Sequence, residues 1–147
     1  MTRIFPKRPK SLEEKATIFI LSGDAISAFQ TLNGRPRSES EAFIVDLAES
    51  IILGEVETAD GKDGFKKAIL PPNSIIGILR TLRTINGEEK KRLAKLFFTY
   101  CEKHNWPGIQ LKIFQLPGME SDLATRRAIE EKIINRITYK VAAAVTA

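Results

Sequence analysis

The chain contains a single cysteine and a single histidine among its 147 residues, and this scarcity excludes several kinds of chemistry. Cys101 alone can form no internal disulfide, which is typical of a protein from a reducing compartment. His104 alone excludes a metal site built from several histidines, and any Ser-His-Asp arrangement would depend on it. Cys101 and His104 are three apart on a predicted helix, but nothing else resembles the surroundings of a nucleophile. We therefore expect a protein that is not an enzyme and binds no cofactor or metal.

Long apolar runs are also missing, and this absence bears on localisation. The longest runs, such as Ile18–Leu21, are far too short to cross a bilayer. The basic N-terminus is followed by no continuous apolar stretch of signal length. We therefore expect a soluble, cytoplasmic protein with no membrane partner.

What the chain does contain is typical of a small globular protein. Hydrophobic residues make up 43% and charged residues 28%, which argues against wholesale disorder. Only 3 glutamines accompany 18 isoleucines, a bias that resembles the composition of thermophile proteins. Residues 1–10 are basic and contain two prolines, so we expect an extended basic arm there. Residues 11–147 are long enough for a single helical domain.

Apolar residues recur at helical spacing over most of the chain, which predicts a mainly α fold, a helical bundle. One helix is expected between Glu88 and about His104, and a long final helix is expected to bury Leu123, Ile129, Ile133, Ile134 and Ile137. Polar residues suited to capping precede the predicted helices. They are Ser11, Asp24, Ser38 or Ser40, Asn73 or Ser74, and Ser121 or Asp122.

The pattern changes near residue 53, where a small β insertion is expected over about 53–70. Gly54–Thr58 and Phe65–Leu70 flank Asp60–Gly64, a loop rich in turn formers, and together they predict a β-hairpin. Ile109–Leu116 alternates between apolar and polar residues at its start, so we expect a third strand there. The loop is read as a plain turn, because Lys62 occupies the place of a calcium ligand.

Basic residues carry the strongest functional signal. The link at Asn86-Gly87 is short, so the helices on either side are expected to pack antiparallel and to bring their cations together. Such stripes suit the phosphate backbone of DNA or RNA and read no bases. The predicted cations are Arg80, Arg83, Lys91, Arg92 and Lys95 on the helix pair, Arg126, Arg127 and Arg136 on the last helix, and Arg3, Lys7, Arg8 and Lys10 in the arm.

A solvated face is the alternative interpretation of these cations. Glu88, Glu89, Glu130 and Glu131 lie close to them in the sequence and could neutralise them as surface ion pairs. A helical protein-interaction or scaffolding domain, assembled from copies of itself or with other subunits, would need no nucleic acid.

The order of elements resembles that of the small subunit of archaeal type I CRISPR effector complexes. Helices precede a hairpin at Gly54–Leu70, a helix pair follows Pro71-Pro72, and a strand and a final helix complete residues 12–140. The resemblance implies a non-enzymatic subunit that supports nucleic-acid strands through backbone contacts, and it assigns no site residue. The nucleocapsid proteins of filamentous archaeal viruses are similarly small, helical and basic. Their basic arms resemble residues 1–10, although the hairpin and the strand fit them less well.

Overall fold

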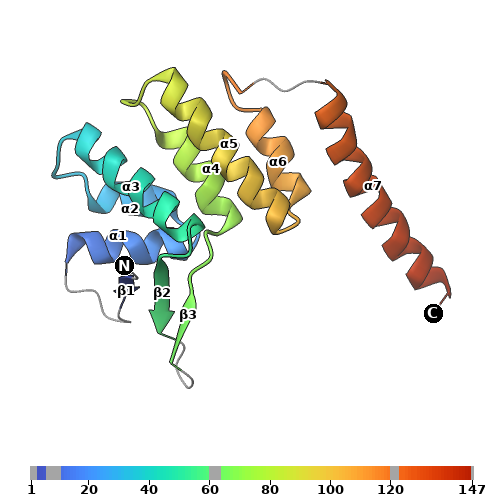
Figure 1. Cartoon of the computed structure of the whole chain (residues 1–147), viewed down its shortest axis with the longest axis horizontal. Coiled ribbons are helices and arrows are strands. Elements are labelled where there is room, and N and C mark those ends of the chain that lie inside the picture. The colour runs from blue at the N-terminus through green and yellow to red at the C-terminus, as the bar shows by residue number, and fades with distance from the viewer. Residues whose placement is uncertain (1–2, 6–10, 60–63, 120–122, 147) are drawn as a thin grey trace. The chain divides into compact units, whose positions relative to one another are not determined.

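The computed structural model describes residues 3–5, 11–59, 64–119 and 123–146, with side chains described over 11–59, 64–119 and 123–136 (Figure 1). These ranges contain seven helices and three short strands. The predicted mainly α fold with a small β insertion is confirmed. The chain divides into two compact units, Met1–Asn86 and Gly87–Ala147. The predicted single domain and the antiparallel helix pair span both units and stay predictions.

The first unit begins with two capped helices, α1 (Leu12–Leu21) and α2 (Ala25–Thr31). The Ser11 hydroxyl accepts a hydrogen bond from the Glu14 amide at 3.1 Å, and the Asp24 carboxylate accepts one from the Ser27 amide at 3.0 Å. Each side chain satisfies an amide that the first helical turn leaves unpaired. Both predicted caps are confirmed.

Prolines, and not the predicted polar residues, precede the next two helices. Pro36 stands before α3 (Arg37–Ile52) and Pro71 before α4 (Pro72–Thr81). The predictions of Ser38 or Ser40 and of Asn73 or Ser74 as caps are therefore wrong. Ser40 and Ser74 are buried inside the helices, where their hydroxyls donate to the carbonyls of Leu32 and Ile20. These serines join neighbouring segments, which a local sequence pattern does not reveal.

The three strands form one sheet in the order β1 (Arg3–Phe5), β2 (Val56–Ala59), β3 (Phe65–Lys67). The antiparallel pairing of β2 with β3, with Glu57 opposite Lys67, confirms the predicted hairpin. β1 runs parallel to β2, with Arg3 opposite Val56. The third strand therefore comes from the predicted arm, and Ile109–Leu116 is not a strand.

Residues 107–114 form a helix, α6 (Pro107–Phe114), which corrects the predicted strand. Pro107 occupies the first helical turn, where proline is favoured because its missing amide would be unpaired anyway. Gln110 and Ile113 are buried, three residues apart on one face. The buried residues therefore recur at helical spacing, and the proline in the first turn was the local signal for a helix.

The second unit consists of α5 (Gly87–Lys103), α6 and α7 (Leu123–Thr146). α5 matches the helix predicted from Glu88 to His104, and it ends in a Schellman motif. Asn105 adopts a positive φ of 60°, and the Trp106 amide donates to the Cys101 carbonyl at 2.9 Å. This motif satisfies backbone carbonyls that the last turn leaves without partners.

The apolar face predicted for α7 is only partly correct. Ile129 is buried and Ile133 half-buried, but Leu123 and Ile134 are 60% and 59% exposed. Ile134 lies five residues after Ile129, about 140° around the helix, so one face cannot hold both. The Ile137 side chain and the predicted caps Ser121 and Asp122 lie outside the described residues.

Because Gly77 has no side chain, α2 and α4 can approach each other closely. A Cβ atom added at Gly77 would lie only 2.8 Å from the Cβ of Ala25, which is itself buried. Real carbon atoms do not approach this closely without displacement. Gly77 is therefore a packing residue, although glycine is a weak helix former.

A buried carboxylate joins α3 to the segment that follows α4. Glu41 is fully buried, and its Oε1 accepts hydrogen bonds from the amides of Arg83 at 2.8 Å and Thr84 at 2.9 Å. Its Oε2 accepts one from Arg37 Nε at 2.7 Å. Burial acts to raise the pKa of Glu41, but the hydrogen bonds from Thr84, Arg37 and Arg83 together hold this pKa below its ordinary value.

We predict that Gly77→Ala destabilises the protein by about 1–2 kcal/mol, although alanine is the better helix former. Overpacking against Ala25 outweighs the gain in helix propensity. Chemical denaturation measures the change in unfolding free energy. The control is Gly108→Ala in α6, where an added Cβ meets open space and stability should stay equal or rise. Equal stabilisation by both substitutions would show that the α2–α4 contact imposes no constraint.

We predict that Glu41→Gln lowers the unfolding free energy by roughly 1–3 kcal/mol near neutral pH, because Arg37 loses its buried anionic partner. A depressed carboxylate pKa contributes stability that is present above the ordinary value of 4.5 and disappears as pH falls through the folded pKa. The difference between the two proteins in urea denaturation should therefore shrink from about pH 7 to about pH 3. A difference that stays constant would contradict an ionised Glu41.

Candidate nucleic-acid interface

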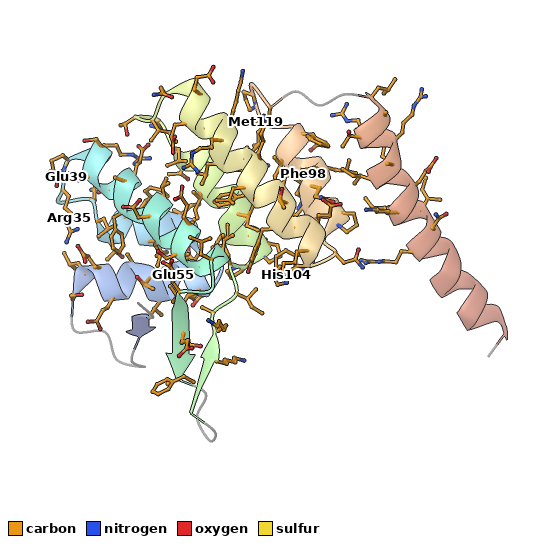
Figure 2. The ribbon with its side chains drawn as sticks, in the orientation of Figure 1. Arg35, Glu39, Glu55, Phe98, His104 and Met119 are labelled. Carbon is orange, nitrogen blue, oxygen red and sulfur yellow. The ribbon has the colours of Figure 1, made fainter. Side chains whose placement is uncertain are left out.

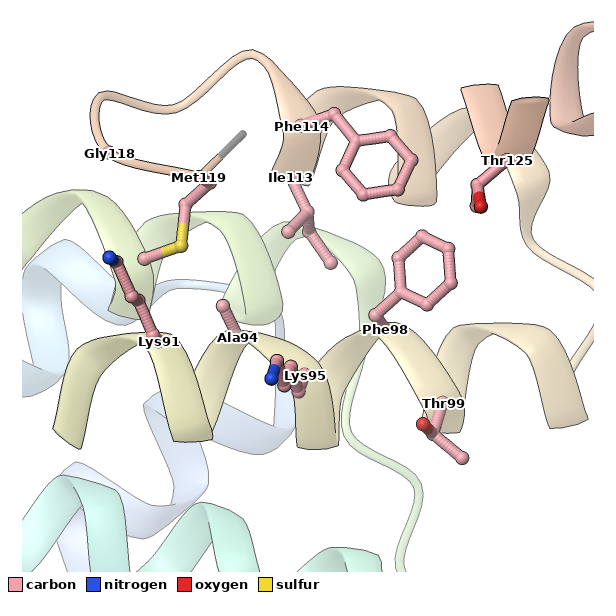
Figure 3. A pocket seen from close by; sticks show the side chains of 10 residues that line it. All are labelled: Lys91, Ala94, Lys95, Phe98, Thr99, Ile113, Phe114, Gly118, Met119 and Thr125. Carbon is pink, nitrogen blue, oxygen red and sulfur yellow. The ribbon is translucent and has the colours of Figure 1, made fainter. Parts of the chain in front are cut away.

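The second unit contains a half-open hollow of about 670 Å³ between α5, α6, the turn after α6 and the start of α7 (Figure 3). Its described lining combines apolar side chains with two lysines and two threonines, and no acidic side chain of the described residues belongs to it. The lining residues are Lys91, Ala94, Lys95, Phe98, Thr99, Ile113, Phe114, Gly118, Met119 and Thr125.

Helical spacing on α5 places the cations beside the apolar part of the hollow. Lys91, Lys95 and Thr99 follow one another at intervals of four residues and form an exposed row. Ala94 and Phe98 form a second row directly beside the first, and they are buried and half-buried respectively. The helix therefore presents an ammonium row along one edge of an apolar surface.

Two phenylalanines form the aromatic part of the lining. The ring centroids of Phe98 and Phe114 lie 4.9 Å apart with an angle of 34° between the planes, and both side chains are half-buried. Buried Gln110 donates through Nε2 to the Phe98 carbonyl at 3.3 Å and so links α6 to α5 beside this pair. The rings face each other across the two helices and keep part of their surface accessible (Figure 3).

The electrostatic surroundings separate Lys91 and Lys95 from Arg92. Neither lysine forms an ion pair with any residue in the described part of the chain, and both are exposed. Arg92 instead donates through Nε to both carboxylate oxygens of Glu89 at 3.1 Å, and the Arg92 hydrogen bond lowers the pKa of Glu89. Arg92 therefore matches the alternative interpretation, in which surface cations are neutralised by ion pairs. The charges of Lys91 and Lys95 are not neutralised by an acidic side chain of the described residues.

The first unit holds two further predicted cations. Arg80 lies in the last turn of α4 and Arg83 follows that helix, and both side chains are exposed. The backbone amide of Arg83 is fixed by Glu41, so its position on this unit is well defined. The predicted proximity of Arg80 and Arg83 to the cations of α5 joins the two units and stays a prediction.

The predicted cations of α7 differ in their surroundings. Arg126 is half-buried, whereas Arg127 and Arg136 are exposed, and Arg136 donates to the Asn105 carbonyl at 3.4 Å. The exposed Glu130 and Glu131 lie on the same helix. This helix is therefore a less purely cationic surface than the row on α5. Of the predicted arm, Arg3 lies in β1, while Lys7, Arg8 and Lys10 lie outside the described residues.

Sequence reasoning missed the aromatic and thioether part of the hollow. Phe98 was given no role in the predicted helix from Glu88 to His104, and Phe114 was hidden by the incorrect strand at 109–116. Met119 follows the helix in a turn. Two features of the sequence could have indicated this part of the hollow. The proline at the start of α6 favours a helix there, and the three-residue spacing of Lys95 and Phe98 places the two side chains next to each other on α5.

Cys101 and His104 do not form a catalytic pair. Cys101 is fully buried, and burial raises the pKa of its thiol to about 12. The His104 ring, labelled in Figure 2, stacks on Trp106 with centroids 4.8 Å apart and contacts Tyr100 at 4.4 Å. Among the described residues, no three His, Cys, Asp or Glu side chains are grouped as metal ligands would be. Nor does any helix in the described ranges have the length and apolarity that a membrane span requires.

We predict that Cys101 in the native protein resists alkylation by iodoacetamide at about pH 8, because the reactive thiolate is scarce and the sulfur is covered. Mass spectrometry should detect complete modification only after denaturation. Rapid labelling of the native protein would show that the thiol is accessible.

The chain matches no protein-family model, no curated protein and no solved structure.

Proposed function

We propose that this chain is a non-enzymatic, sequence-independent nucleic-acid-binding subunit of a larger assembly in the cytoplasm. The observation that supports this proposal is the exposed row on α5. Among the residues that the structure describes, Lys91 and Lys95 have no acidic partner and the adjoining hollow has no acidic lining residue. Lysine ammonium groups on long flexible stems bind phosphate as point charges and require no particular base.

The spacing of the two lysines suits a strand of phosphates. Four residues of α-helix separate their Cα atoms by about 6 Å along the axis, so the two charges can contact neighbouring groups on one backbone. Binding of this kind releases counterions and weakens steeply as salt increases. Arg127 on α7 offers a further exposed cation on the same unit.

The proposal agrees with the resemblance to the small subunit of archaeal type I CRISPR effector complexes. Such a subunit supports strands through their backbones and performs no chemistry, which fits a cationic row without a catalytic group nearby. The nucleocapsid proteins of filamentous archaeal viruses remain the competing resemblance, since they too would bind the backbone.

A second candidate function is protein interaction within an assembly, and α7 supports it. Leu123 and Ile134 are each exposed by more than half on this helix. Exposed apolar residues of this size are favoured at contacts with another subunit or another copy of the chain. The two functions are compatible, because a subunit must contact both its neighbours and the strand.

We predict that Lys91→Glu combined with Lys95→Glu weakens binding of a mixed-sequence single strand at low salt by at least tenfold. The slope of log K against log salt should also fall by about 0.7 for each phosphate contact removed. Fluorescence anisotropy at two salt concentrations measures both quantities. The control is Lys103→Glu combined with Lys112→Glu. It reverses one exposed charge on α5 and one on α6, and neither residue lines the hollow.

The control variant should retain most of the affinity, although its net charge changes by the same amount. Equal losses in both variants would show that only net charge matters and would refute the α5 row as the site. Absence of binding by the unmodified chain at low salt would refute the proposed function.

A further inference from the structure

The hollow beside the lysine row has features that phosphate binding alone does not require. A backbone contact needs exposed cations and no cavity. Yet the lysines border a recess whose surface includes Ala94, Phe98, Ile113 and Phe114. An occupant of this site would place an anionic group at the rim and an apolar or flat group inside. The charge and the shape of the lining therefore specify two different parts of one ligand.

We propose that the hollow receives an unstacked nucleobase of a single strand while Lys91 and Lys95 hold the adjoining phosphates. This inference rests on the proposed function and deepens it, because it assigns the substrate class as single-stranded nucleic acid. Bases in a duplex are paired and stacked on both faces, so they cannot enter a recess on a helix surface. Single strands expose their bases, which proteins bind by stacking on aromatic side chains.

The aromatic pair defines how the base binds. Because the Phe98 and Phe114 rings already contact each other at 4.9 Å, a base cannot slide between them and must stack on an accessible outer face. Ile113 and Met119 extend the apolar surface on the side of Lys91, as Figure 3 shows. Methionine adapts its shape and its sulfur makes favourable contacts with aromatic rings, which suits bases of different size.

The lining also predicts that the site does not select a base. Reading a base requires donors and acceptors aligned with its edge. Most of the described lining is apolar, and its polar side chains are lysines and threonines, which match no single base pattern. Every base has a flat apolar face, so stacking combined with phosphate contacts gives sequence-tolerant binding.

The size of the recess and its open side favour a nucleotide unit over a long-chain lipid. About 670 Å³ falls within the range typical of small-molecule sites, and the recess is open on one side. An open recess leaves room for the chain to enter and leave in both directions, as a polymer requires. A free acyl chain would need an enclosed channel to cover its length.

The deciding experiment compares three probes of equal length by fluorescence anisotropy at one salt concentration: a mixed-sequence single strand, an abasic single strand and a duplex. The base-bearing strand should bind roughly 5- to 150-fold more tightly than the abasic strand, the range expected for stacking of one base. The duplex should bind no better than the abasic strand.

Ring-removing variants locate the effect. Phe98→Leu combined with Phe114→Leu should abolish the preference for the base-bearing strand over the abasic strand. Phe65→Leu is the matched control, because Phe65 is 56% exposed on β3 and lies outside the hollow. It should preserve the preference.

Photocrosslinking tests the unmodified chain and so does not depend on how the variants fold. A strand carrying 5-iodouracil should form adducts at Phe98, Phe114 or Met119, and adducts found only elsewhere would overturn the inference. Equal affinity for the abasic and base-bearing strands would also overturn it and leave the proposed function standing. Failure of both strands to bind would refute the proposed function and this inference together.

Discussion

Buried polar side chains that bond to the backbone of another segment are the constraint on which both units depend. In the first unit, Ser74 joins α4 to α1, and Glu41 joins α3 to the segment after α4. In the second unit, Gln110 joins α6 to α5. No buried side-chain nitrogen or oxygen in the described residues lacks a partner. Since an unpaired buried polar group is costly, each bond selects one register of packing among several that apolar contacts alone would allow.

The same packing creates the candidate site. Gln110 lies on the inner face of α6, so α6 presents Phe114 to the row on α5 that contains Phe98. The polar row of α5 remains outside this contact, and Lys91 and Lys95 therefore keep both their exposure and their charge. Arg92, one position away on the same helix, is bound to Glu89 and contributes little net charge to the surface. A single turn of helix thus holds both a cation that is neutralised and cations that have no acidic partner among the described residues.

Stability and binding are assigned to different residues in this chain. Gly77, Glu41 and the buried serines serve packing in the first unit, whereas the hollow of the second unit includes surface that packing leaves open. Surface substitutions at exposed lysines seldom change stability by more than a few tenths of a kcal/mol, or about 0.5 at most. The proposed effect of Lys91 and Lys95 on nucleic-acid affinity can therefore be measured separately from changes in folding.

The sequence by itself determined the helical class, the hairpin, the caps at Ser11 and Asp24 and the cations of α5, because each depends on spacing or on one local hydrogen bond. Tertiary structure alone decided that Ser40 and Ser74 are buried links and that β1 completes the sheet. It also decided that Phe98 meets Phe114. These outcomes depend on partners 8 to 54 residues apart, and the pattern of a short segment carries no information about a partner so distant.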